Sequence, residues 1–206
     1  MSNAPHYDID VQAFWADPYP DLARMRKDAP IAFVPQLGST IFTRRDDIFT
    51  QEKRVDLFFS GRVTGSSTLR ARGLAELKAL ERQGVTLDIP DAPLPRAQFY
   101  QRCAAAHLVW SPEGLGWDCF RHYEAPACGS VPLINQPWLD RHAPLIAGEH
   151  ALYYDVEPGG LTRAVTAALA DKAALARIAA AAQAHVMAHH TPAALARYVV
   201  EEARAL

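Results

Sequence analysis

The sequence predicts an α/β fold for residues 55–206, a parallel sheet covered by helices on both faces, after a small helix-plus-hairpin segment. Short apolar segments rich in β-branched and aromatic residues recur along residues 55–206. They alternate with segments of helical periodicity, and Gly or Pro separates many of them. Strands joined by helical crossovers pair in parallel and are buried on both faces, so this alternation indicates the fold class.

The composition is that of a globular protein of one or two domains. The 206 residues are 50% hydrophobic and 21% charged. The formal net charge of −2 gives no sign of nucleic-acid binding. No apolar run reaches the ~18 residues that span a bilayer, and the start, MSNAPHYDID, lacks the basic and apolar regions of a secretion signal. We therefore expect a cytoplasmic protein without a membrane span.

Cysteines and histidines give little indication of a metal site. Cys103, Cys119 and Cys128 are odd in number and have no C-x-x-C spacing, which favours reduced core cysteines over a disulfide framework or a zinc site. His185 and His189 have a spacing that can chelate a metal on a helix, but no glutamate completes an H-E-x-x-H motif. A solvated helical face is the simpler interpretation, and no bound metal is expected.

Residues 1–54 predict a helix, a hairpin and a second helix. ADPYPDLARMRKDAP predicts a short helix that ends before Pro30, with Leu22 and Met25 spaced as on one helical face. IAFVPQ and STIFTRR predict two strands joined at Leu37–Gly38, and RRDDIFTQEKR is compatible with a second helix. About 50 residues is close to the lower size limit for independent folding.

The stretch WADPYPDLARMRKDAPIAFVPQLGSTIFTRRDDIFTQEKRVDLF, within residues 7–58, resembles the amino-terminal part of bacterial cytochrome P-450 (haem-thiolate) monooxygenases. In that family a D-P-Y-P helix precedes a two-stranded hairpin and an R-x-D-D helix. The chemistry of the family is missing here, because no Phe-x-x-Gly run leads to a Cys-x-Gly haem-ligand loop. The resemblance therefore implies a fragment without haem, and no cofactor is expected.

Residues 55–206 predict strands and helices in alternation. The predicted strands are VDLFFSG, VTLDIPD, HLVW, VPLIN and HALYYDV. The predicted helices are TLRARGLAELKALERQ, ending at Gly84; PRAQFYQRCAAA; the run GGLTRAVTAALADKAALARIAAAAQAHVMAHH, split near Asp171; and TPAALARYVVEEARAL, with Thr191 as N-cap and Pro192 at the first position. Together these strands and helices predict a Rossmann-like sheet. Ligands of such sheets bind beyond the carboxyl ends of the strands.

The segment Ser111–Asn135, SPEGLGWDCFRHYEAPACGSVPLIN, lies beyond one such strand end. It predicts a glycine-bearing loop and then a short helix over residues 123–128, ended by Gly129. The expected start follows from Pro126, because proline fits the first turn of a helix but costs about 3 kcal/mol in a helix interior.

Five residues of this segment are candidates for binding a sugar–phosphate ligand. Arg121 and Glu124 would fall at the mouth of the helix, where free N–H groups and the dipole attract anions. Arg121 can neutralise phosphate with its planar fork of donors, although a surface cation is the alternative. Gly114 and Gly116 would let the backbone approach a ligand, or serve as turn glycines. Trp117 would stack on a base or sugar, or pack as a lid on the core.

This segment, with FFSGRVTG before it and HALYYDVEPGGLTRAVTAALADKAALARIAAAAQAHVMAHHTPAALARYVV after it, resembles the carboxy-terminal domain of group 1 GT-B glycosyltransferases. The nearest subgroup is the CgeB-like, spore-maturation-protein type. The resemblance covers residues 55–206 and implies binding of a nucleoside-diphosphate sugar donor. The junction KRVDLFFSGR fits both resemblances, which suggests that two gene segments were joined.

The resemblance implies roles for further residues of the sequence. Many relatives carry two glutamates in E-x7-E spacing, and Glu124 matches the second, which usually holds the ribose. Gly116 stands in the position of the first, and Glu113 lies nearby but out of register. The carboxylate that would touch the donor sugar is therefore in question, and no catalytic residue is assigned. Gly61 and Arg62 follow the first strand and would face the same ligand.

Three functions of different classes remain open from the sequence. The first is glycosyl transfer by a chain that is incomplete on its own. Residues 1–54 are too few to form an acceptor domain, so a partner chain would supply that domain. The second is a nucleotide-binding module without turnover. The third is a truncated remnant of a haem-thiolate monooxygenase.

Overall fold

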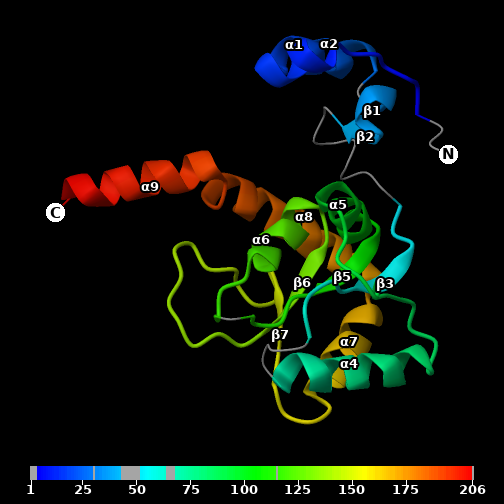
Figure 1. The fold of residues 1–206 in the computed structure, drawn as a ribbon. Coiled ribbons are helices and arrows are strands. Elements are labelled where there is room, and N and C mark those ends of the chain that lie inside the picture. Colours follow the sequence, from blue (N-terminus) through cyan, green and yellow to red (C-terminus); the bar gives the residue numbers. More distant parts are fainter. Residues whose placement is uncertain (1–3, 30, 43–51, 64–67, 115, 206) are drawn as a thin grey trace. The chain divides into compact units, whose positions relative to one another are not determined.

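The computed structural model describes residues 4–29, 31–42, 52–63, 68–114 and 116–205. It divides the chain into two compact units, residues 1–51 and 52–206. The helices and strands, in chain order, are α1 (Val11–Ala16), α2 (Tyr19–Asp28), β1 (Ile31–Val34), the 3-10 helix η1 (Pro35–Leu37), β2 (Ser39–Phe42), β3 (Val55–Phe58), α4 (Thr68–Glu81), β4 (Leu87–Asp88), α5 (Arg96–Ala104), β5 (Ala106–Trp110), α6 (Phe120–Ala127), β6 (Val131–Asn135), β7 (Leu152–Tyr154), α7 (Gly160–Leu169), α8 (Lys172–His189) and α9 (Pro192–Ala205) (Figure 1).

The amino-terminal unit contains the predicted hairpin. β1 and β2 are antiparallel, and Gly38 between them has a φ of 60°, a left-handed conformation that glycine adopts without strain. The predicted helix before Pro30 is also present, and α2 ends at Asp28 because the residue before a proline avoids the helical region. Met25 of α2 is fully buried in the core of this unit.

Two details of this unit differ from the expectation or go beyond it. The sequence analysis missed α1, which begins after Asp10, whose carboxylate accepts a hydrogen bond from the backbone N–H of Ala13. The predicted helix RRDDIFTQEKR falls largely on residues 43–51, which lie outside the described residues.

The carboxy-terminal unit is built on a five-stranded sheet in the order β4-β3-β5-β6-β7. Every neighbouring pair is parallel, which confirms the predicted sheet. β3 is the first strand of this unit along the chain, β4 lies on one side of it, and the next strands extend on the other side. The strand order therefore reverses between β3 and β5, and parallel sheets bind ligands at such a switch point.

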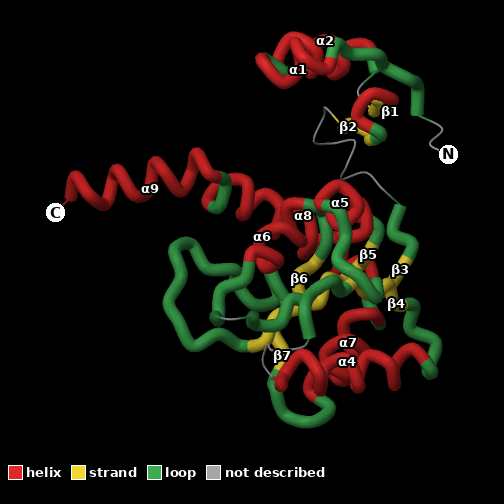
Figure 2. The backbone as a smooth tube through the Cα atoms, in the orientation of Figure 1, coloured by secondary structure: helices red, strands yellow, loops and turns green. Residues whose placement is uncertain are grey.

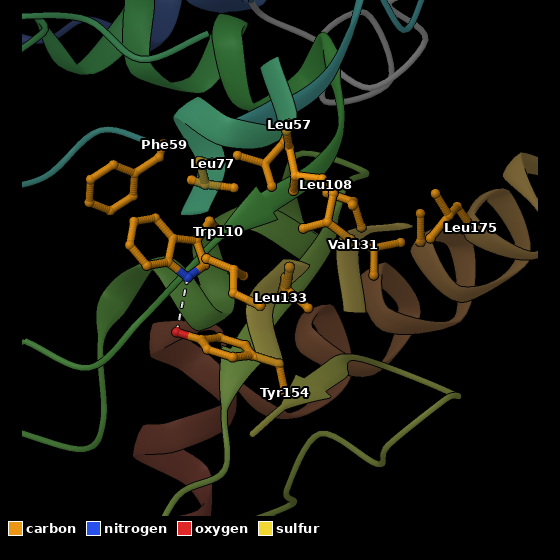
Figure 3. Packing of buried hydrophobic residues seen from close by; sticks show 13 residues of the cluster. Leu57, Phe59, Leu77, Leu108, Trp110, Val131, Leu133, Tyr154 and Leu175 are labelled. Atoms are coloured by element: carbon orange, nitrogen blue, oxygen red, sulfur yellow. Dashed lines mark hydrogen bonds between the residues drawn. The ribbon is translucent and has the colours of Figure 1, made fainter. Parts of the chain in front are cut away.

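Helices cover both faces of the sheet, as predicted. α4 and α7 pack together on one face, and α5, α6 and α8 cover the other (Figure 1). The strands form the layer between them (Figure 2). Within the core, the indole N–H of Trp110 donates to the Tyr154 hydroxyl at 3.0 Å (Figure 3). A Cβ on Gly73 of α4 would lie 2.2 Å from the Trp110 ring, so this helix–sheet contact requires glycine.

The short helix α6 begins earlier than the sequence predicted. It spans Phe120–Ala127 rather than residues 123–128, and Pro126 lies inside it. The prediction was wrong because the proline removes one backbone hydrogen bond, whereas the helix buries Arg121, His122 and Ala125. Gly129 follows the helix with a φ of 72°, as expected for a glycine that ends a helix.

The ends of α5 and α6 are joined by a lysine that precedes β3. The Lys53 ammonium donates to the carbonyl oxygens of Ala104 and Gly129 at 2.9 and 2.7 Å, and to the Ser130 hydroxyl at 2.9 Å. A cation at two helix carboxyl ends offsets their dipoles. Across the described segments, no helix is long and apolar enough to cross a membrane.

Candidate functional site

The candidate site lies beyond the carboxyl ends of β3, β4 and β5. The chain after β3 and the chain after β5 flank the switch point of the sheet. A cavity of about 750 Å³ opens beside it. It is lined by residues 59–63 after β3, by residue 87 and residues 89–94 in and after β4, and by Leu74, Lys78 and Glu81 of α4. A cavity of this size fits a ligand as large as a nucleotide.

Two arginines from different helices bridge the loops of the switch point. Arg121 of α6 donates from Nη2 to the Ser60 carbonyl at 2.6 Å, and its guanidinium carbon lies 5.2 Å from the centre of the Phe59 ring. Arg70 of α4 donates from Nε to the Glu113 carbonyl at 2.9 Å and from Nη1 to the Arg62 carbonyl at 2.8 Å. Both side chains are thus held by backbone carbonyl oxygens.

No carboxylate of the described residues lies within ion-pair distance of this arginine pair, although the charge of Glu113 acts on Arg70 from farther away. Arg70 and Arg121 are 6% and 8% exposed. In the described part of the chain neither forms an ion pair, and the buried Nε of Arg121 has no hydrogen-bond partner. Burial, followed by the neighbouring charge of Arg121, lowers the pKa of Arg70. Two buried cations with an unused donor are suited to an anion that enters from solvent.

Two of the predicted glycines pack directly against these guanidinium groups. A Cβ on Gly61 would lie 2.8 Å from Nη2 of Arg121, and a Cβ on Gly114 would lie 3.0 Å from Nη2 of Arg70. A Cβ on Gly116 would meet nothing within 4 Å. Gly61 and Gly114 therefore leave room for the two arginines, whereas Gly116 does not have this role.

Replacing Gly61 by Ala is expected to weaken anion binding about tenfold, because the added methyl group displaces the Arg121 guanidinium from Ser60. Glu201→Ala, on the exposed face of α9 and outside the candidate site, is the control. Calorimetric titration of both variants with a nucleoside diphosphate checks this. Equal affinities of the two variants would show that the position of Arg121 is irrelevant to binding.

The loop after β5 is tied to the end of β6. The Glu113 backbone N–H donates to Oδ1 of Asn135 at 2.8 Å, and Nδ2 of Asn135 donates to the Glu113 carboxylate at 3.1 Å. Asn135 is buried at the carboxyl end of its strand. This two-way hydrogen bond fixes the loop and places the Glu113 carbonyl where Arg70 uses it.

A second buried pair lies under the same loop. The Ser111 hydroxyl is 2.7 Å from Nδ1 of His122, and Nε2 of His122 is 3.2 Å from the carbonyl oxygen of Trp117. The carbonyl can only accept, so Nε2 carries the proton and Nδ1 accepts from Ser111. Burial, followed by the charge of Arg141, lowers the pKa of His122 to about 4. The neutral ring therefore links Ser111 to the backbone of Trp117 at neutral pH.

The Trp117 carbonyl also receives a hydrogen bond from Nη2 of Arg141 at 2.9 Å. Arg141 is further paired with Asp118, its Nε lying 3.2 Å from the carboxylate, and the Tyr123 hydroxyl donates to Asp118 at 3.0 Å. The Trp117 side chain itself is 39% exposed, and Phe120 is 86% exposed. The backbone of this segment is thus fixed, while two aromatic side chains stay accessible to a ligand.

Glu124 lies in a different environment from the arginine pair. It is the fifth residue of α6, one turn beyond the helix mouth at which the sequence analysis placed it. Its half-buried carboxylate accepts a hydrogen bond from the Tyr100 hydroxyl of α5 at 3.4 Å. Burial, followed by the charge of Glu124, raises the pKa of Tyr100. Tyr100 therefore stays protonated and able to donate.

The structure brings part of the predicted site together. Contacts of Arg70 and Arg121 join Gly61, Arg62, Glu113 and Gly114 at the switch point. Gly116 is linked to them through its carbonyl, which accepts from the Gly114 N–H at 3.1 Å. Sequence reasoning missed five residues of the site: Arg70, Tyr100, Ser111, His122 and Asn135.

Two of the missed residues carry a signal in the sequence. Arg70 lies in the first turn of α4, where a positive charge interacts unfavourably with the helix dipole. An arginine at this position therefore indicates a role other than stabilising the helix. Asn135 is a polar residue at the end of an apolar strand, at the edge where ligands bind. The sequence gives no such signal for Ser111 or His122. The structure identifies them as a pair because the Ser111 hydroxyl lies 2.7 Å from Nδ1 of His122.

Metal-ligating residues do not converge at this site. Among the residues that the structure describes, no group of His, Cys, Asp and Glu side chains is arranged to hold a metal ion. The described cysteines Cys103, Cys119 and Cys128 are unbridged.

Comparisons with known proteins agree with this architecture. The model of a family described as glycosyl transferase-like matches residues 90–201. Sucrose-phosphate synthase from Thermosynechococcus elongatus is similar in structure with a TM-score of 0.54 and 14% identity, over 78% of this chain and 47% of that chain. The chain thus spans about half the length of that relative. No curated protein sequence gives a significant match.

Two further solved structures share the fold. The C-terminal domain of a group 1 family glycosyl transferase from Francisella tularensis gives a TM-score of 0.50 and 10% identity, over 72% of this chain and 94% of that chain. TarM gives a TM-score of 0.51 and 8% identity, over 73% of this chain and 35% of that chain. The five-stranded parallel sheet with its helices is therefore the fold of GT-B carboxy-terminal domains.

Proposed function

Because the chain belongs to the glycosyl transferase-like family, we propose that residues 52–206 bind a nucleoside-diphosphate sugar as the donor for glycosyl transfer. The observation that carries this proposal is the arginine pair at the switch point. Arg70 and Arg121 are buried, lack a carboxylate partner among the described residues, and leave Nε of Arg121 without a hydrogen bond. A diphosphate supplies the negative charge and the acceptor oxygens that both guanidinium groups need.

The surroundings support a nucleotide rather than a simple inorganic anion. The cavity of about 750 Å³ is lined in part by Gly61 and Arg62, which adjoin the arginine pair. Its other walls combine apolar residues, including Leu74 and Ile89, with the charged Lys78, Glu81 and Asp91, and such a mixed lining suits a base that has both an apolar face and polar edges. We propose that the diphosphate binds at the arginines, that the nucleoside extends into the cavity, and that Trp117 contacts the base or the sugar.

Calorimetry of the purified chain with UDP, GDP and ADP, and with sugars linked to each, tests the proposal. We expect saturable binding of at least one diphosphate, weakened by salt because the contact is ionic. Inorganic diphosphate should bind less tightly, since it leaves the cavity empty. No heat with any nucleotide, under conditions where the chain is folded, would remove the proposal.

Replacing Glu124 by Ala is expected to weaken nucleotide binding by about 1–3 kcal/mol if its carboxylate accepts from the ribose hydroxyl groups. Tyr100 supports this role by orienting the carboxylate at 3.4 Å. Glu201→Ala on the exposed face of α9 is the matched control. Deoxyribose analogues make the test specific, because Glu124→Ala should bind ribose and deoxyribose nucleotides alike. A variant that still prefers ribose would exclude this assignment.

The finer family assignment is also a proposal. We assign residues 55–206 to the CgeB-like subgroup, residues 7–58 to a cytochrome P-450-like segment, and the junction to a gene fusion. Sequencing the locus from an independent isolate tests the fusion. We expect no Soret band after haem is added to the purified chain, and the appearance of a thiolate-type band would favour the monooxygenase remnant instead.

Turnover by this chain alone is a separate question from donor binding. The carboxy-terminal unit has a single five-stranded sheet among its described residues, and the described residues 4–29 and 31–42 form two α-helices, a 3-10 helix and a hairpin. Transfer needs an acceptor held against the donor, and proximity supplies several kcal/mol of the barrier reduction. We propose that a partner chain supplies the acceptor domain, and that the purified 206 residues bind donor with near-zero turnover. Efficient turnover without a partner would refute this part.

A further inference from the structure

Five histidines gather at one end of α8, away from the arginine pair in sequence. We call His142, His150, His185, His189 and His190 the histidine cluster. The rings of His150 and His185 are stacked with centroids 4.1 Å apart, and the ring of His189 lies 4.8 Å from that of His185. The remaining centroid distances are 5.7 Å for His185–His190, 6.0 Å for His142–His190 and 6.3 Å for His142–His189. The expectation of a solvated helical face was wrong for His185, which is half-buried against loop 136–150.

Two histidines of the cluster bind the backbone of loop 136–150 at a residue with a strained conformation, Ala143. Nε2 of His185 and Nε2 of His190 each lie 2.8 Å from the carbonyl oxygen of Ala143. Ala143 has a φ of 42°, the left-handed region that residues with a Cβ rarely adopt. Two imidazole N–H groups on one carbonyl hold the loop in this conformation. These two hydrogen bonds offset the cost of the left-handed conformation of Ala143.

The groups that face the cluster offer little negative charge. Glu149 on the same loop lies 3.4 Å from Nε2 of His150 and is the acid nearest to a ring. Two tyrosines lie against cluster rings: the Tyr123 ring of α6 is 4.5 Å from that of His190, and the Tyr198 ring of α9 is 3.7 Å from that of His142. Tyr153 is also uncharged, and its hydroxyl donates to the Leu145 carbonyl. Arg141 is already paired with Asp118. Adding protons to several of these neighbouring imidazoles would therefore accumulate positive charge within the cluster.

We propose that the histidine cluster is an acid-sensitive clasp, which fixes loop 136–150 against α8 at neutral pH and releases it when the imidazoles become charged. The Nε2–H groups donate to Ala143 in the neutral and in the charged rings, but charged rings at these distances repel one another, and this repulsion opposes the two hydrogen bonds. Release separates loop 136–150 from the end of α8.

The direction of the pH dependence follows from the burial of the rings. Burial, followed by the charge of His185, lowers the pKa of His150, and burial also lowers the pKa of His190. The closed form therefore binds fewer protons than the open form between these lowered pKa values and the ordinary value near 6.5. The clasp is fully stable above about pH 6.5 and is weakened as the pH falls through that window.

Release of loop 136–150 would affect the candidate site because Arg141 connects the two. This residue belongs to loop 136–150 and holds the Trp117 carbonyl and Asp118. Opening the clasp would free the segment that carries Trp117. This consequence for ligand binding rests on the proposed function, whereas the release of the loop does not.

Hydrogen exchange of the whole chain, followed by mass spectrometry without nucleotide, tests the clasp. After correction for the intrinsic exchange rate, amides of residues 139–149 should exchange about tenfold faster at pH 5.5 than at pH 7.5. The double variant His185→Gln, His190→Gln keeps two N–H donors for Ala143 but removes two of the five titratable rings, so its exchange should depend on pH much less than that of the wild type. His6→Gln, in the amino-terminal unit, is the control and should behave as the wild type.

Two outcomes would overturn the proposal. One is equal protection of residues 139–149 at both pH values in the wild type, and the other is an equal pH response of the wild type and the double variant. Histidine-ring NMR of the wild type is a second measurement that needs no variant. The rings of His150 and His190, whose pKa values are lowered by burial, should titrate below the ordinary value near 6.5. Titration of both rings at the ordinary value would also contradict the clasp.

Discussion

Replacing Arg121 by Met is expected to weaken nucleoside-diphosphate binding by about 1.5–3 kcal/mol, roughly 10- to 150-fold in Kd. The guanidinium is buried, its Nε has no partner in the described chain, and it lies at the switch point beside Arg70. The phosphate oxygens would lose a charge-assisted hydrogen bond in a site of low dielectric constant. Arg121→Lys should recover part of the loss, because it keeps the charge but not the planar fork.

Stability measurements separate this role from a structural one. Met keeps the packing against Phe59 and removes a buried cation, but it also leaves the Ser60 carbonyl without this donor, so the free energy of unfolding of the unliganded protein should fall by no more than about 1–3 kcal/mol. Arg177→Met on the exposed face of α8 is the matched control and should change neither quantity. A large loss of stability with unchanged binding would mean that Arg121 is a structural residue and would contradict the proposed site.

Acidification from pH 6.5 to pH 4 is expected to lower the free energy of unfolding by about 3 kcal/mol through His122 alone. The ring is fully buried, and its pKa is lowered to about 4. In the folded state it therefore stays neutral where the unfolded chain is already protonated. The unfolded state binds more protons in this window, so stability rises with pH up to about 6.5 and is lost as the pH falls.

Urea denaturation at pH 7 and pH 4.5 checks this prediction. His122→Gln keeps an acceptor for Ser111 and a donor for the Trp117 carbonyl but cannot titrate, so its stability should fall much less on acidification. Other groups, including the histidine cluster, also lower the free energy of unfolding on acidification. This contribution is the same in both proteins and cancels in the comparison. Equal acid losses in the wild type and His122→Gln would show that His122 does not contribute.

The arginine pair and the histidine cluster are both places where local rules are broken. A cation in the first turn of α4, two buried guanidinium groups without a carboxylate and a non-glycine residue at positive φ each reduce stability. Such departures are expected where a site is organised for a ligand or a conformational change. The core around Trp110 shows no such conflict, since its indole N–H is satisfied by Tyr154.

Most secondary-structure elements follow from the sequence because their causes are local. β5 and β6 are short apolar runs between turn residues, and the period of apolar residues in α4 is that of a helix. Thr191 caps α9 through its hydroxyl, at 3.2 Å from the Ala194 N–H, as its position in the sequence predicts. The alternation of these elements also determines the parallel sheet, because helical crossovers leave few other arrangements.

Tertiary structure alone decided which side chains meet. Gly61, Arg70 and Glu113 are distant in sequence and converge because β3 and β5 are neighbours at the point where the strand order reverses. The start of α6 depended on what it buries, and that packing outweighed the local effect of Pro126. His150 and His185 come together because loop 136–150 folds back on α8. Local patterns carry no information on such pairs, since their energies arise between segments that only the folded sheet brings into contact.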